Sequence, residues 1–84
     1  MMHELAAFEE EDFLTIDVVL IDTKSGVEIV NESDNTIFFF TYGTLMGFYM
    51  RPKTRFVLFC SKDDFLDKVY KIYVEDFQEN SQVG

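Results

Sequence analysis

The stretch "NTIFFFTYGTLMGFYM", residues 35–50, decides the fold, because it holds sixteen consecutive uncharged residues in a chain of formal net charge −9. A membrane-spanning helix needs about 20 apolar residues, so the stretch is too short to cross a bilayer. Residues 36–42 are aromatic and β-branched, which favours a strand. Gly43 and Thr44 can form a two-residue hairpin turn, after which 45–51 returns as a second strand. We therefore interpret the stretch as two adjacent core strands.

The strand pattern continues on both sides of this hairpin. Residues 13–21 alternate, with Leu14, Ile16, Val18 and Leu20 on one face, which predicts a strand. The glycine-containing turn 23–26 and the alternating residues 27–30 then predict a β-hairpin, and 31–35 are turn formers. Toward the C-terminus, Pro52 favours another turn, and 55–60 predict the third strand of a meander that starts at residue 36.

Residues 61–78 support two interpretations. Ser61 is a candidate helix N-cap, and Asp63 and Asp64 suit the first turn of a helix. Apolar residues recur at helical spacing over 65–77, which predicts an amphipathic helix over 62–78. Residues 69–74 also alternate and are rich in β formers, so 61–67 could instead be one helical turn and 68–75 a sixth strand of a small closed barrel. A short helix is also expected over 3–10.

These patterns predict an α+β fold, an antiparallel meander of about five strands with one C-terminal amphipathic helix. The 84 residues are enough for one domain, so we expect 1–84 to form a single domain with 1–10 and 79–84 frayed. Hydrophobic residues make up 48% of the chain, which is more than one small core needs. We therefore expect a homodimer or a partner to cover an apolar face.

The acidic residues concentrate near the N-terminus. Residues 1–34 contain ten acids and one base, whereas 35–84 contain six of each. Such a field repels nucleic-acid phosphates and anionic lipid and attracts basic proteins. We therefore expect a basic protein partner, with no direct contact to nucleic acid or membrane. The expected partner-binding residues are Glu9, Glu10, Glu11, Asp12, Asp17, Asp22, Glu28, Glu32 and Asp34.

The leading functional hypothesis is a small acidic, non-enzymatic protein-binding module, an inhibitor or regulator. A nucleic-acid-binding protein would be a natural target, with the acidic surface acting as a nucleic-acid mimic, as in small phage-encoded inhibitors and immunity proteins of similar size and charge. The alternative is a structural homo-oligomer assembled through an aromatic sheet face. A simpler explanation of the acidity is solubility alone.

The basic residues of "RPKTR" form the one positive patch of the sequence. They can pair with the acidic N-terminal half, either within one molecule or between two copies. The residues expected to mediate self-association are Phe38, Phe40, Phe48, Arg51, Lys53 and Arg55.

No residue pattern predicts an enzyme. Cys60 is the only cysteine and His3 the only histidine, and a thiol nucleophile needs a base beside it, so we expect Cys60 to be a small core or edge residue. The aspartates of 63–67 are explained by helix N-terminal stabilisation, and the sequence has no calcium loop. We expect no catalytic residue, metal or cofactor, and rank a ligand pocket around 42–47 last.

A cytoplasmic location is expected. The N-terminal stretch "MMHELAAFEEEDF" lacks the basic start and the apolar run of a secretory signal, and its acidic residues interrupt any such run.

Overall fold

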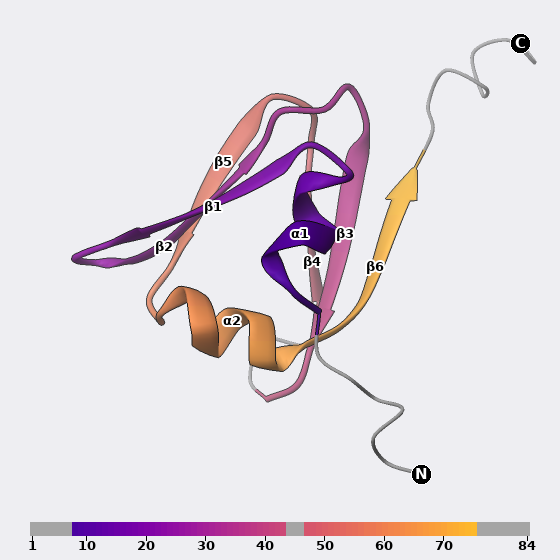
Figure 1. Cartoon of the computed structure of the whole chain (residues 1–84). Helices are drawn as coiled ribbons and strands as arrows, with labels where there is room; N and C mark the ends of the chain where they lie inside the picture. Colours follow the sequence, from indigo (N-terminus) through magenta and orange to yellow (C-terminus); the bar gives the residue numbers. More distant parts are fainter. Residues whose placement is uncertain (1–7, 44–46, 76–84) are drawn as a thin grey trace, which may run out of the picture.

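The computed structural model describes residues 8–43 and 47–75, which form six antiparallel strands and two helices (Figure 1). The α+β class is confirmed, but the strand count and the position of the main helix differ from the prediction. The helices are α1 (Glu10–Leu14) and α2 (Lys62–Lys68). The strands are β1 (Val18–Thr23), β2 (Gly26–Asn31), β3 (Thr36–Thr41), β4 (Gly47–Met50), β5 (Thr54–Leu58) and β6 (Val69–Glu75).

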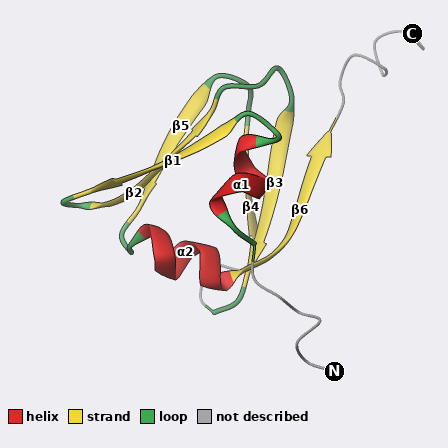
Figure 2. Ribbon diagram, viewed as in Figure 1, coloured by secondary structure: helices red, strands yellow, loops and turns green. Residues whose placement is uncertain are grey.

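The strands form two three-stranded sheets of order β1-β2-β5 and β4-β3-β6 (Figure 2). Alternate residues of both sheets point into one shared core, because apolar side chains at every second position cover one face of a strand. Three phenylalanines join the helices to this core. The ring of Phe13 from α1 lies 5.8 Å from Phe39 of β3 and 5.6 Å from Phe65 of α2, between ring centroids. All three are buried.

The hairpin predicted at the N-terminal side is present as β1 and β2, with Thr23 paired to Gly26. Gly26 has φ +149°, and a Cβ built on it would lie 2.0 Å from the carbonyl oxygen of Leu58. Only glycine allows β5 to approach the backbone this closely.

The predicted strand over residues 13–21 is wrong before Val18. Residues 10–14 form α1, and the strand begins only after a turn that contains Asp17 at φ 61°. The helix starts where the Asp12 carboxylate accepts the Glu9 N–H at 2.8 Å, a contact that satisfies a free donor at a helix N-terminus. The helix buries Phe13 and leaves Leu14 52% exposed, the reverse of the predicted faces. Of the short helix expected over 3–10, residues 3–7 lie outside the described part of the chain. The expectation is wrong for Phe8 and Glu9, which precede α1 and are not helical.

The predicted meander over residues 36–60 is only half correct. β3 and β4 pair as expected, although residues 44–46, which include Thr44 of the predicted turn, lie outside the described chain. β5 pairs with β2 instead of β4. The buried amide of Asn31 explains the separation, because it donates to the carbonyls of Met50 at 3.1 Å and Arg51 at 3.0 Å, where β4 ends. These bonds hold the end of β4 against the end of β2, and the chain crosses from one sheet to the other.

The predicted helix over 62–78 ends at Lys68. Ser61 is its N-cap, as expected, and accepts the N–H of Asp64 at 3.1 Å. The chain then becomes extended at Val69 and continues as β6, antiparallel to β3. Residues 69–74 are strong β formers. Their pairing with β3, the central strand of the sheet, therefore outweighs the helical spacing of the apolar residues over 65–77. The alternative of one helical turn and a sixth strand describes this region, although the strands form two sheets and not a closed barrel.

Candidate binding surfaces

The outer face of sheet β4-β3-β6 is aromatic. In the strand register, Phe38 lies between Tyr49 and Tyr73, with both ring centroids 5.8 Å from its own. Phe40 lies between Gly47 and Lys71, and the Lys71 ammonium is 5.6 Å from the Phe40 ring centroid. We define the aromatic face as Phe38, Phe40, Tyr42, Tyr49, Tyr70 and Tyr73.

A β-bulge enlarges this face. The register shifts between Phe40 and Thr41, so that Tyr70 joins the outer side and its ring lies 4.5 Å from that of Tyr42. All four tyrosines of the chain therefore gather here, and each is 43–55% exposed. Gly47 leaves a shallow hollow of about 450 Å³ beside Phe40. Tyrosine combines a rigid apolar ring with a hydroxyl at its tip, a combination enriched at protein interfaces.

The structure brings together two of the six residues predicted for self-association. Phe38 and Phe40 lie on the aromatic face. Phe48 lies on the opposite side of β4, with its ring 5.2 Å from both Phe39 and Phe56. The sequence analysis did not predict the four tyrosines as self-association residues. The strand interpretation of residues 69–74 would have put Tyr73 in a sheet.

Two of the three basic residues pair with acids of the N-terminal half within one molecule. The ammonium of Lys53 donates to the Glu32 carbonyl at 2.8 Å and lies 3.5 Å from the Asp34 carboxylate. Arg55 binds Glu28 across β5 and β2 at 2.8 Å. Arg51 is exposed after β4, and its carbonyl accepts from Asn31. Two of the three bases are therefore paired with acids of the same molecule.

Five of the nine predicted partner-binding acids gather where α1, β1 and α2 meet. The backbone N–H of Lys62 donates to the Asp22 carboxylate at 2.9 Å, and its ammonium donates to Glu10 at 3.1 Å. These two hydrogen bonds of Lys62 join α1, β1 and α2, and each of the three elements carries acidic residues. We define the acidic end as Glu9, Glu10, Glu11, Asp12, Asp22, Asp63 and Asp64, of which the last two were assigned from the sequence to helix stabilisation only.

The other four predicted acids lie elsewhere. Glu28 and Asp34 pair with Arg55 and Lys53 as described, and the Glu32 N–H donates to the carbonyl of Asp17 at 2.9 Å. Two of these four acids, Glu28 and Asp34, are therefore paired with bases. The acidity of the molecule is therefore unevenly distributed in space as well as in sequence.

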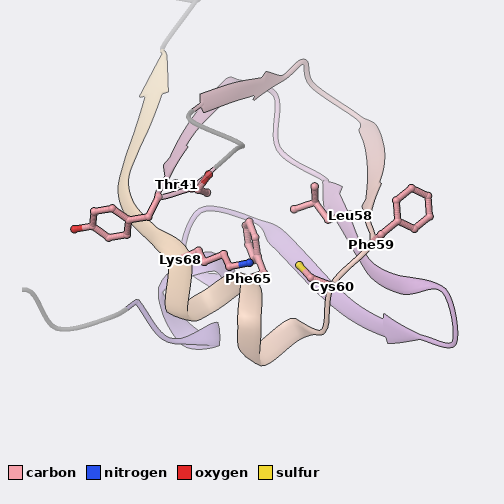
Figure 3. A pocket seen from close by; sticks show the side chains of 8 residues that line it. Thr41, Leu58, Phe59, Cys60, Phe65 and Lys68 are labelled. Carbon is pink, nitrogen blue, oxygen red and sulfur yellow. The ribbon is translucent and has the colours of Figure 1, made fainter.

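A cavity of about 180 Å³ lies between α2 and the ends of β3 and β5 (Figure 3). It is lined by Thr41, Tyr42, Gly43, Leu58, Phe59, Cys60, Phe65 and Lys68. Burial raises the pKa of the Cys60 thiol; the charge of Lys68 acts in the opposite direction, and that of Asp64 adds to the rise. A thiol with a raised pKa is a poor nucleophile at neutral pH.

Within residues 8–43 and 47–75, no three His, Cys, Asp or Glu side chains are arranged to hold a metal ion. The helices in the same part of the chain are too short and too polar to cross a bilayer. No protein-family model matches the sequence, no curated protein matches it, and no solved structure matches its fold at a significant level.

Proposed function

We propose that the chain is a small non-enzymatic protein-binding module, an inhibitor or regulator that docks on a basic protein partner. The observation that carries the proposal is the aromatic face, six rings on one three-stranded sheet, four of them tyrosines 43–55% exposed. Contiguous exposed apolar surface marks interaction sites, and tyrosine supplies contact area at a low cost in side-chain entropy. Half-exposed rings on a sheet form a rigid docking surface.

The acidic end supports a basic partner. Seven carboxylates lie around the single contact between Lys62, Glu10 and Asp22, in a chain of net charge −9. A concentrated negative field raises the rate at which a basic protein associates, whereas contact energy comes mainly from buried rings. The two surfaces therefore have different roles, steering for the acidic end and docking for the aromatic face. A nucleic-acid-binding protein is one class of partner with a suitable basic surface.

Affinity capture with matched charge variants tests this proposal. One bait carries Glu9→Gln, Glu11→Gln and Asp63→Asn at the acidic end, and its control carries Asp17→Asn, Glu32→Gln and Asp34→Asn, an equal loss of charge. Proteins retained from a cell lysate are eluted by a salt ramp. A basic protein released at lower salt from the first bait, but not from the control, is the expected result. Equal elution from both baits, or retention of no basic protein, would contradict the proposal.

A homodimer through the aromatic face is the second candidate. β6 is an edge strand of its sheet, and Lys71 and Glu75 lie two residues on either side of Tyr73. Alternate residues of a strand share a face, so these three project to the same side. A two-fold axis beside Tyr73 would place Lys71 of one copy opposite Glu75 of the other.

A charge exchange tests the homodimer. Lys71→Glu or Glu75→Lys alone should weaken dimerisation in sedimentation equilibrium, and the double exchange should restore it. A chain that sediments as a monomer over the accessible concentration range would rule this candidate out.

A further inference from the structure

Thr41 lines the cavity, and its buried side-chain hydroxyl has no hydrogen-bond partner within the described part of the chain. Thr41 is 2% exposed, and its Oγ1 makes no hydrogen bond within the described part of the chain. A buried polar group without a partner is costly, and valine would give nearly the same shape without that cost. A polar group inside the cavity would satisfy this hydroxyl.

Lys68 brings positive charge to the same wall. Thr41 pairs with Val69 in the sheet register, and the N–H of Tyr42 donates to the Lys68 carbonyl at 3.1 Å. The Lys68 side chain is directed toward Phe65 and Cys60 (Figure 3). Thr41 and Lys68 therefore line the same cavity, and each carries a group that can donate a hydrogen bond.

The remainder of the cavity wall is mostly apolar and sets the size of an occupant. Phe65 is 1% exposed and Leu58 is half-buried, and both line the cavity. The volume of about 180 Å³ is close to that of an apolar cavity of about 150 Å³ that binds benzene in another protein. A single ring or a branched alkyl group therefore fits, whereas drug-sized ligands need pockets of about 300 Å³ or more.

We propose that this cavity binds a small monocarboxylate with a compact apolar body. The carboxylate accepts hydrogen bonds from the Lys68 ammonium and the Thr41 hydroxyl, and the body packs on Phe65 and Leu58. Charge-assisted hydrogen bonds of this kind are about twice as strong as neutral ones, so the acid is preferred over its neutral analogue. A cationic ligand of the same shape is repelled by Lys68. The site does not depend on the protein-binding function proposed above.

The test compares three ligands of one shape. The protein labelled with ¹⁵N is titrated with benzoate, with the neutral analogue benzamide and with the cation benzylamine, followed by amide chemical shifts. Benzoate is expected to bind with a Kd of about 1 mM, which is typical of so few atoms, and to shift the amides of Thr41, Cys60 and Lys68. Benzamide should bind about tenfold more weakly, and benzylamine should cause no shifts at these residues.

Three variants separate binding from folding. Thr41→Val and Lys68→Met should each weaken benzoate binding about tenfold, whereas Lys71→Met removes the same charge from the aromatic face and should not. Thr41→Val should keep or raise the melting temperature, because it removes a buried hydroxyl without a partner. Unchanged benzoate affinity in folded Thr41→Val, equal shifts with benzylamine, or no shifts up to about 20 mM benzoate would overturn the proposal.

Discussion

The two sheets share one core but present different outer faces. On sheet β1-β2-β5 the outer residues are aliphatic, and the cross-strand ion pair of Glu28 and Arg55 lies among them at 2.8 Å. On sheet β4-β3-β6 the outer residues are aromatic, and the charged neighbour Lys71 lies over the Phe40 ring. One outer face therefore pairs its charges internally, and the other exposes rings and hydroxyls.

Exposure alone does not distinguish the two faces. Ile21 and Val57 on the first sheet are 42% and 39% exposed, and Tyr70 on the second is 43% exposed. Single exposed aliphatic residues are normal on protein surfaces, whereas tyrosine is enriched among the residues that dominate binding energy. The kind of side chain, and the contact between rings, therefore distinguish the second face, which is the one we propose as a binding surface.

The largest expected effect tests the shared core. Phe39→Ala removes a buried ring that contacts both helices and should cost about 3–5 kcal/mol, because it leaves a cavity. Phe40→Ala, the next residue on the same strand, should cost much less, since its half-buried ring lies on the outer face. Urea denaturation measures both. Equal losses of stability would show that the inner and outer faces of β3 are assigned incorrectly.

The next effect tests the link between the sheets. Asn31 is fully buried, donates to three backbone carbonyls and accepts from the N–H and hydroxyl of Ser33 at 3.0 and 2.6 Å. Asn31→Ala leaves these groups unsatisfied and should cost about 2–3 kcal/mol. Asn35→Ala is the control, because Asn35 contributes only backbone groups to this network. A similar loss in both variants would argue against Asn31 as the joint between β2 and β4.

A smaller effect is expected on the aliphatic outer face. Glu28→Gln breaks the ion pair with Arg55 and should lower the free energy of unfolding by about 0.5–1 kcal/mol at low salt and by less at high salt. Asp34→Asn should change stability less, since both partners of the Asp34–Lys53 pair are mostly exposed. Urea titrations at two salt concentrations give the comparison. A salt-independent loss for Glu28→Gln would contradict an electrostatic role.

The smallest effect concerns Cys60, which lies between β5 and α2 in the chain and lines the cavity. Burial raises its pKa, so iodoacetamide should react more slowly with the folded than with the urea-unfolded chain at the same mildly alkaline pH. Because the pKa of Cys60 is higher in the folded than in the unfolded chain, the neutral thiol contributes to the free energy of unfolding. This contribution is fully present below the pKa of the unfolded chain and is lost as pH rises through the pKa of the folded chain. Cys60→Ala should remove that loss. Lys68→Met should slow alkylation further, and faster alkylation would contradict the stated electrostatics.

Local signals in the sequence predicted much of the fold. The turns at 23–26 and 31–35, the hairpin of β3 and β4, and the cap at Ser61 depend on neighbouring residues only, and all are present in the described chain. The partner of β5 and the end of α2 depend on contacts distant in sequence. The amide of Asn31 decides the first, and no local pattern reports it. For the second, the alternation over 69–74 left strand and helix both open, and the pairing of Val69 with Thr41 decides between them.

The candidate surfaces also depend partly on local sequence patterns and partly on contacts between residues distant in sequence. Phe38 and Phe40 were predicted to mediate self-association, and both lie on the aromatic face. Tyr70 and Tyr73 reach that face only because β6 pairs with β3 through a bulge. The acidic end likewise depends on the contact of Lys62 with Glu10, which are 52 positions apart in the sequence. Long-range pairing therefore determines which predicted residues lie together.

The most direct test of the account compares the two outer faces as binding surfaces. Three baits are used in quantitative capture from a cell lysate: the wild-type chain, Tyr49→Thr with Tyr73→Thr, and Ile21→Thr with Val57→Thr. Threonine keeps the strand preference at all four positions, and urea denaturation confirms that both variants are folded. The account predicts a protein retained by the wild-type and aliphatic-face baits and lost from the aromatic-face bait. A partner lost from the aliphatic-face bait alone, or retained equally by all three, would contradict it.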